Sequence, residues 1–146
     1  MVMGENVERK ELAIQLKHNR HNCCQAVLGA FADEVSLSED ALRQLGAAFG
    51  GGMGRMEGTC GALVAAEMLL GLKRFEGRPV GRDAAALHKR FEELCGATIC
   101  KDLKGRDTHV VLCECDDCIR HAVELAEELL EIAAIALLQG GDNGQN

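Results

Sequence analysis

The sequence predicts an all-α protein, a single compact bundle of about six helices around a buried central helix. Of the 146 residues, 47% are hydrophobic but only 3% are aromatic, so the core has to be built from closely packed aliphatic side chains. The most β-branched run, over residues 110–115, is too short and isolated to pair as a sheet. A chain of this length buries one core. We therefore expect one domain over residues 1–146, with disorder at 1–4 and 140–146.

The N-terminal third of the chain predicts three helices. Residues 5–18 show a charged amphipathic pattern, which is typical of a surface helix. Residues 22–34 begin with an asparagine, a common N-cap, and carry apolar residues for the core. Before the third segment, residues 38–49, Ser36 and Glu39 have the spacing of a capping box.

The central helix is predicted over residues 59–72, with Thr59 as its cap. This segment is apolar on every side apart from Glu67, as expected of a helix that is buried all round. Several of its residues are small and would let neighbouring helices approach closely. These are Gly61, Ala62, Ala65 and Ala66.

Three further helical segments are predicted after the central helix. Residues 83–95 end at Gly96, a good C-terminal cap, and residues 98–103 form a short turn. The last helix, residues 117–138, has one polar stripe, and its other faces are apolar. Because a chain of this size does not easily cover so wide an apolar surface alone, we expect a homodimer.

Charge and cysteine content narrow the function. The net charge of −7 argues against nucleic acid as a partner, because phosphates require a basic surface. Residues 1–11 lack the apolar region of a secretory signal, and the longest apolar runs, 61–72 and 132–138, are too short to insert into a membrane. We therefore expect a cytoplasmic protein. In a reducing compartment its eight cysteines serve as metal ligands or redox-active thiols rather than as a disulfide framework.

Four of the cysteines fall in the first turn of a predicted helix: Cys23, Cys60, Cys100 and Cys118. A helix N-terminus offers unpaired N–H groups and a partial positive charge, and both favour the ionised sulfur. The thiolate is the species that attacks disulfides and binds metals. These four positions are therefore the candidate metal ligands.

The reactive centre is predicted at Cys60, which follows the glycine-rich residues 50–54. Gly58, Thr59 and Gly61 flank it and are the candidate cofactor-contacting residues. Gly61 would leave one side of the sulfur uncrowded, and the preceding glycines would bring backbone N–H groups near it. The alternative is that Cys60 is a small core residue and that glycine only permits tight packing.

The other four cysteines have weaker signals. Cys113, Cys115 and Cys118, followed by His121, have a spacing that suits zinc or iron–sulfur ligation, although His121 also lies on the polar stripe of the last helix. Cys24 lies about 100° around the helix from Cys23. Cys95 is predicted at a helix C-terminus, where the dipole opposes a thiolate. We therefore expect Cys24 and Cys95 to be packing residues.

The order of these motifs resembles that of the C-GCAxxG-C-C family of redox-active proteins. The resemblance rests on residues 22–28, 58–62 and 99–105 and on Cys118, and it runs from about residue 10 to residue 135. The family's four cysteines fall on the four helix-start cysteines named above. The chain departs from the family at Ala65, where the family motif usually ends in glycine.

Three functions follow as hypotheses. In the first, Cys23, Cys60, Cys100 and Cys118 hold a metal centre, with iron–sulfur favoured, and the chain transfers electrons to or from a redox partner protein. The second is a metal-free thiol–disulfide oxidoreductase, with Cys60 attacking and Cys23 or Cys100 resolving. The third is a structural zinc site in a partner-binding module.

Overall fold

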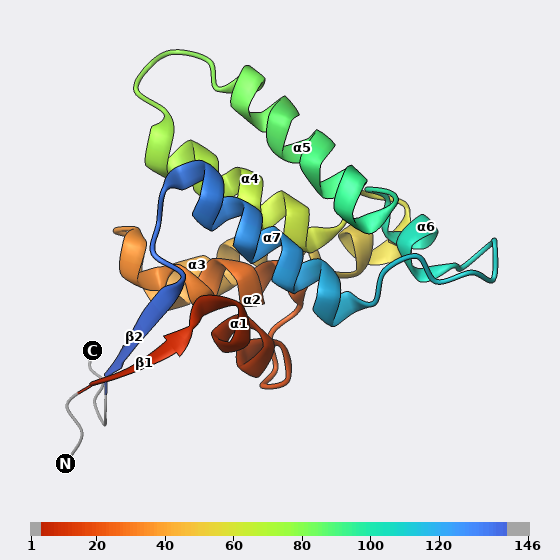
Figure 1. Cartoon of the computed structure of the whole chain (residues 1–146). Coiled ribbons are helices and arrows are strands. Elements are labelled where there is room, and N and C mark those ends of the chain that lie inside the picture. Colours follow the sequence, from red (N-terminus) through yellow and green to blue (C-terminus); the bar gives the residue numbers. More distant parts are fainter. Residues whose placement is uncertain (1–3, 140–146) are drawn as a thin grey trace.

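The computed structural model describes residues 4–139. The predicted disorder at 1–3 and 140–146 lies outside the described residues, and residue 4, which we also expected to be disordered, begins a strand. Helices dominate (Figure 1), as the sequence predicts. They are α1 (Arg9–Lys17), α2 (Cys23–Ala30), η1 (Ala32–Glu34), α3 (Glu39–Gly46), η2 (Gly52–Met56), α4 (Gly61–Arg74), α5 (Gly81–Cys95), α6 (Cys100–Lys104) and α7 (Cys115–Leu130).

Helix α4 is the buried central helix that the sequence predicts. It packs against α2, α5 and α7, and its small residues bring these neighbours close. Its one internal carboxylate, Glu67, is about one-third exposed and lies 3.3 Å from Nδ1 of His88 on α5. The buried residues of α4 are Gly61, Ala62, Leu63, Ala65, Ala66, Leu69 and Leu70.

A two-stranded sheet replaces the ends of two predicted helices. Strand β1 (Gly4–Glu8) pairs antiparallel with β2 (Ile135–Gln139), with Glu8 opposite Ile135. The predicted helix over residues 5–18 is therefore wrong in its first turn, and the last helix stops at Leu130 instead of residue 138. Each strand pairs one edge of its backbone with the other strand, about 130 positions away, and local periodicity does not reveal such a pairing.

Glu131 ends α7 in the left-handed conformation, with φ at 57°. The turn that follows brings the chain back to Arg9, whose backbone N–H donates to the Ala134 carbonyl at 2.7 Å. The Arg9 side chain is 1% exposed and donates to the Ala30 carbonyl and to Asp33, both at 2.7 Å. This buried guanidinium ties the sheet to the end of α2.

Several helix ends differ from the prediction by a few residues. Ser38, not Ser36, caps α3 by accepting the Ala41 N–H at 3.0 Å. Helix α4 begins after Cys60, so that Thr59 does not cap it. Helix α7 begins at Cys115, two residues earlier than expected. The predicted end of α5 at Gly96 is confirmed, and this glycine has φ at 95°.

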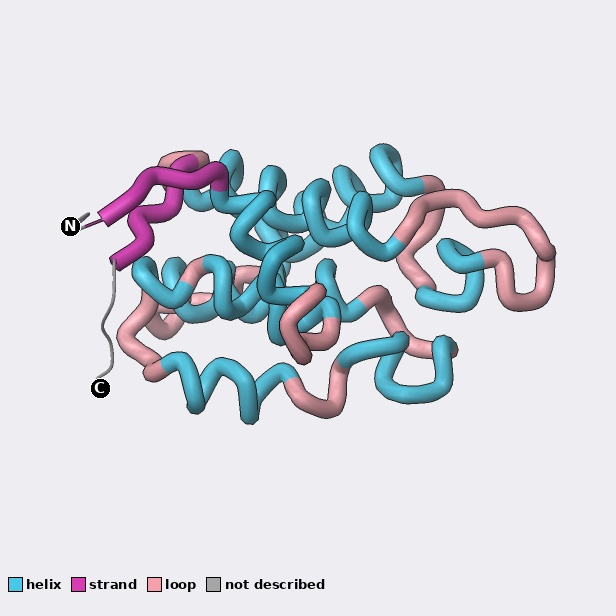
Figure 2. The backbone as a smooth tube through the Cα atoms, turned by 90° about the horizontal axis from the view of Figure 1, so that it is seen from below, coloured by secondary structure: helices cyan, strands magenta, loops and turns pink. Residues whose placement is uncertain are grey.

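The two ends of the molecule are different in character. Figures 1 and 2 show the small sheet at one end and, at the opposite end, α6 with the loop of residues 105–114 and the N-terminal ends of α4 and α7. None of the helices in the described part of the chain is long and apolar enough to cross a bilayer. The apolar face of α7 packs against α1, α4 and α5 of the same chain, so the predicted homodimer would have to use another surface.

Candidate metal centre

Cys23 is fixed at the start of α2 by a complete capping box. The Asn22 side chain accepts the Gln25 N–H, and the Gln25 side chain accepts the Asn22 N–H, both at 2.8 Å. Burial raises the pKa of the Cys23 thiol, and the charge of Cys60 raises it further, while the N–H groups of Gly51 and Cys24 oppose both effects. The glycine-rich segment thus presents an N–H to Cys23, whereas we expected it to serve Cys60.

Cys60 and Cys100 are brought together by their own backbones. Thr59 and Ile99 form an isolated antiparallel bridge. The Cys60 N–H donates to the Thr98 carbonyl at 2.8 Å, and the Cys100 N–H donates to the Gly58 carbonyl at 3.0 Å. The carbonyl groups of Gly58 and Thr98 therefore position the two cysteines through main-chain hydrogen bonds, which places the starts of α4 and α6 side by side.

Two glycines, Gly52 and Gly61, allow the segments that carry the cysteines to lie close to one another. A Cβ atom on Gly61 would lie 2.6 Å from the sulfur of Cys23, so the space beside Gly61 that we expected to remain open is filled by Cys23. A Cβ atom on Gly52 would lie 2.5 Å from the Cβ of Cys100. At both positions a side chain would collide with a candidate ligand.

Cys118 lies in the fourth position of α7, and its thiol is close enough to Cys60 for each to act on the pKa of the other. The pKa of the Cys60 thiol is raised, first by its hydrogen bond with Cys118, then by burial and by the charge of Cys118; the N–H groups of Ala62 and Leu63 oppose this. The pKa of Cys118 is also raised. The contact with Cys60 lowers it, but a contact with Cys95 and burial outweigh that effect.

Lys104, at the end of α6, is the cation of the cluster. Its ammonium nitrogen lies 3.8 Å from the sulfur of Cys118. Burial opposes its charge, yet its pKa is raised because the charges of Cys118, Cys115 and Cys60 more than compensate. At Cys100, burial raises the thiol pKa while Lys104 lowers it, and the charges of Cys60 and Cys23 add to the rise.

The four helix-start cysteines therefore meet in one cluster, which we call the motif cluster: Cys23, Cys60, Cys100 and Cys118. Cys115, half-buried at the first position of α7, lies at its edge and acts electrostatically on Cys23 and Cys100. All eight cysteines lie within the described residues and are free thiols.

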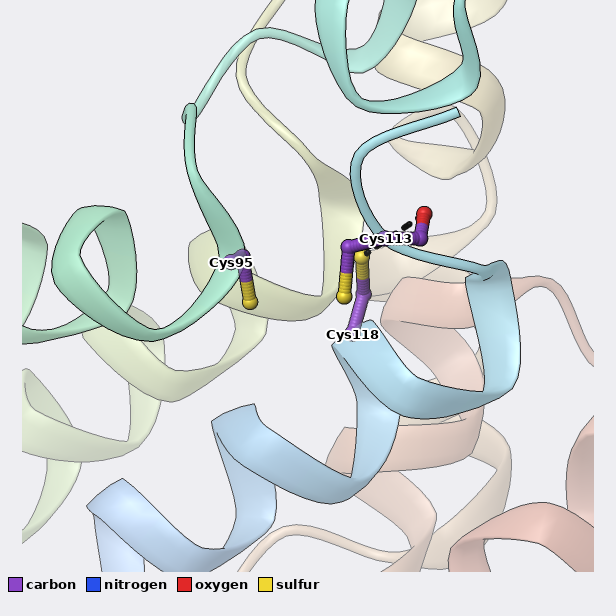
Figure 3. Close-up of side chains that lie close together, drawn as sticks. All are labelled: Cys95, Cys113 and Cys118. Carbon is purple, nitrogen blue, oxygen red and sulfur yellow. Dashed lines mark hydrogen bonds between the residues drawn. The ribbon is translucent and has the colours of Figure 1, made fainter. Parts of the chain in front are cut away.

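A second group of thiols adjoins the motif cluster. The sulfur atoms of Cys95, Cys113 and Cys118 all lie within 4.8 Å of one another, and all three residues are buried. Figure 3 shows the three side chains, with Cys113 and Cys118 side by side and Cys95 next to them. The sequence-based prediction treated Cys95 as a packing residue, because the dipole at a helix C-terminus opposes a thiolate. Neither Cys115 nor His121 belongs to this group, although both were in the sequence-based candidate.

Cys24 behaves as the sequence predicts. It is fully buried, and its sulfur lies beside Gly46, where a Cβ atom would come within 3.3 Å of it. Burial raises the pKa of its thiol to about 12, with smaller contributions from Cys23 and Cys60. It fills space in the core between α2 and α3.

Comparison with known proteins places this chain in a protein family. The model of a protein family described as "Putative redox-active protein (C_GCAxxG_C_C)" matches residues 21–129, a range that contains all eight cysteines. A protein of Archaeoglobus fulgidus that is described as "Uncharacterized protein" is 30% identical, and the similarity covers 69% of this chain and 77% of the relative. No solved structure matches.

Proposed function

Because this chain belongs to the C_GCAxxG_C_C family, which is described as "Putative redox-active protein", we propose that it is an electron carrier. Its metal centre is an iron–sulfur cluster held by Cys23, Cys60, Cys100 and Cys118. The observation that carries the proposal is the meeting of these four thiols from four separate segments at one buried end of the helical bundle. Such a cluster, when bound, supplies one-electron oxidation and reduction.

The donor set fits this group. Iron–sulfur clusters are held by cysteine thiolates, and these four ligands are all sulfur. Cys60, Cys100 and Cys118 are 5% exposed or less, so the protein keeps water away from most of the site. Burial of this kind is one of the means by which a protein sets the reduction potential.

The surrounding groups compensate the negative charge of ligated thiolates. N–H groups of Gly51 and Cys24 face Cys23, and those of Ala62 and Leu63 face Cys60. The ammonium group of Lys104 lies beside Cys118. Hydrogen bonds to ligand sulfurs are a second means of tuning an iron–sulfur potential, and this chain provides them at three of the four ligands.

The spread of the sulfurs supports a cluster of several irons over a single zinc ion. Among the described residues, the compact set of three sulfurs within 4.8 Å is the one formed by Cys95, Cys113 and Cys118, and the motif cluster is not packed as tightly. Sulfurs on one tetrahedral ion have to be near neighbours. Sulfurs that bind different irons of one cluster lie farther apart.

The thiol–disulfide alternative has one observation in its favour, the proximity of the Cys60 and Cys118 thiols, which act on each other's pKa. The resolving thiol would then be Cys118 rather than Cys23 or Cys100. Against it, an attacking thiol works best with a pKa near the ambient pH, and both burial and the Cys118 contact hold the pKa of Cys60 well above its usual range.

The test is the iron and acid-labile sulfide content of the chain, purified without oxygen and after reconstitution with ferrous iron and sulfide, with visible spectra before and after dithionite. We expect iron, sulfide and a band that dithionite bleaches. The matched pair is Cys23→Ala and Cys24→Ala, since these neighbours lie on the same helix and only the first is a proposed ligand. Cys23→Ala should lose most of the iron, and Cys24→Ala should retain it.

Two results would contradict the proposal. A colourless, metal-free chain after reconstitution, with freely titrating thiols, would favour thiol–disulfide exchange. Zinc bound to the motif cluster, without iron, would favour a structural site.

Electron carriers exchange electrons with another protein, so a redox partner protein belongs to the proposal. A homodimer also stays a proposal, which sedimentation can test.

A further inference from the structure

Three buried thiols lie together, and two of them are outside the set that the family motif names. Cys95 is the last residue of α5, Cys113 belongs to the loop before α7, and Cys118 lies in the first turns of α7. They are 3%, 9% and 1% exposed, and their sulfur atoms all lie within 4.8 Å of one another (Figure 3). Two of the three, Cys95 and Cys113, have no part in the motif cluster.

We propose that Cys95, Cys113 and Cys118 form a second site, which binds one thiophilic metal ion of the zinc class. We call it the triad site. Zinc–sulfur bonds of about 2.3 Å in tetrahedral geometry separate the ligand sulfurs by about 3.8 Å. Sulfurs that already lie within 4.8 Å need to move by only about 1 Å to bind such an ion.

The backbones that carry the three thiols are held in place. The Leu103 carbonyl accepts the N–H of Leu112 at 2.9 Å and that of Cys113 at 3.3 Å, which fixes the Cys113 loop against α6. The Cys118 thiol donates to the Cys113 carbonyl at 3.8 Å. Because Cys95 and Cys118 lie on helices, the geometry of the site is largely set before an ion binds.

The chemistry of the triad site selects the kind of ion. It offers three sulfur atoms, and no carboxylate or imidazole belongs to the group. An all-thiol set favours Zn²⁺ and Cu⁺ over Mg²⁺ or Ca²⁺. Three thiolates and a divalent ion leave one negative charge, and the ammonium group of Lys104, 3.8 Å from the sulfur of Cys118, neutralises it.

Cys118 belongs to both groups, since it contacts Cys60 on one side and Cys95 on the other. The triad site can nevertheless be tested apart from the iron–sulfur proposal in the metal-free chain, because Cys95 and Cys113 belong to it alone; with both centres bound, the Cys118 thiolate would have to bridge them. Loss of Cys23 and Cys60 should therefore leave the triad site able to bind an ion. Loss of Cys95 and Cys113 should abolish it and leave the four motif thiols intact.

The experiment titrates the reduced, metal-free chain with Cd²⁺, which reports each sulfur–metal bond by its ultraviolet charge-transfer band, and then displaces Cd²⁺ with Zn²⁺. The variants are Cys95→Ala/Cys113→Ala and the matched control Cys23→Ala/Cys60→Ala. We expect the wild type and the control each to bind one equivalent of Cd²⁺ tightly through three sulfur ligands. In Cys95→Ala/Cys113→Ala its affinity should fall by more than the ~10–100-fold that loss of an outer-shell partner costs.

A second measurement does not depend on whether the variants fold. The wild-type chain with one equivalent of Zn²⁺ is alkylated, and the protected cysteines are identified by mass spectrometry. Protection of Cys95, Cys113 and Cys118 supports the triad site. Protection confined to Cys23, Cys60 and Cys100, or loss of tightly bound Cd²⁺ in Cys23→Ala/Cys60→Ala, overturns it. Neither result measures the iron content that tests the proposed function.

Discussion

Gly61 and Cys23 lie so close that no side chain fits between them. A Cβ atom on Gly61 would come within 2.6 Å of the Cys23 sulfur and within 2.6 Å of the Phe49 carbonyl oxygen. The central helix thus begins with a glycine because a candidate ligand from α2 occupies the place of its side chain. The packing of α4 and the position of one motif thiol are therefore linked.

Gly61→Ala should displace Cys23 and destabilise the chain. A contact of this kind in a packed region costs typically about 1–3 kcal/mol, and we also expect less metal to bind. Urea unfolding gives the stability, and iron content gives the second effect. The control is Gly71→Ala on the same helix, where an added Cβ meets no atom of the described residues within 4 Å. That variant should gain roughly 0.5–1 kcal/mol, and equal effects of the two substitutions would refute the link.

Substitutions at Gly51 and Gly52 distinguish the cost of backbone strain from the cost of a collision with Cys100. Both have left-handed φ angles, 61° and 60°, so alanine at either position costs roughly 1–2 kcal/mol. Only at Gly52 would the new Cβ also collide with Cys100, at 2.5 Å. Gly52→Ala should therefore unfold at a lower urea concentration than Gly51→Ala, with an additional cost of about 1–3 kcal/mol. Identical midpoints would show that the loop moves away freely from Cys100.

Local sequence patterns predict most of the helices of this fold but not its sheet. The apolar periodicity around α4 and the glycine after α5 are local signals, and both elements are where they indicate. The pairing of β1 with β2 joins the two ends of the chain. A strand of five residues with a partner so far away leaves no periodic signal strong enough to outweigh a helical one.

The candidate site, too, has parts that local sequence patterns predict and parts that they do not. Helix-start positions single out the four motif cysteines, because the thiolate preference of a helix N-terminus is a local property. The bridge between Thr59 and Ile99 that joins two of them is not local. The helix-start rule does not select Cys95, because this residue lies at a helix C-terminus. Only the packing of α5 beside α7 brings it to Cys118.

Lys104→Met should weaken metal binding by Cys118. The ammonium group lies 3.8 Å from this sulfur, and it favours the thiolate that binds metal over the thiol. A hydrogen bond to a charged group contributes roughly 1.5–3 kcal/mol, so Cd²⁺ affinity at neutral pH should fall about tenfold or more. The difference should narrow as the pH rises, because protons then compete less with the metal.

The control for this prediction is Lys101→Met on the same short helix. The Lys101 side chain is about one-third exposed and lies 3.8 Å from Asp107. Its removal changes the net charge by the same amount but takes away no donor to a thiol. If both variants bind Cd²⁺ equally, the effect of Lys104 is one of overall charge, and its contact with Cys118 has no role.

Glu127 should make stability depend on pH. Its side chain is 11% exposed, and its Oε2 atom finds no hydrogen-bond partner among the described residues. Burial raises the pKa of this carboxyl to about 7, although the positive charge of Arg9, whose Nε lies 3.5 Å away, opposes the rise. In the unfolded chain the group has its ordinary pKa of 4.5.

Between about pH 4.5 and 7 the folded chain therefore keeps a proton that the unfolded chain has lost. Stability falls with rising pH wherever the folded state binds more protons, so this group should cost stability through that window and its full penalty should remain above pH 7. Glu127→Gln removes the titration and should be more stable than the wild type above the window, by on the order of 1–2 kcal/mol. Urea curves across the window test this against Glu128→Gln, since Glu128 is more than half exposed and paired with Arg90 at 3.3 Å. Curves for Glu127→Gln that run parallel to the wild type would mean that Arg9 keeps Glu127 ionised.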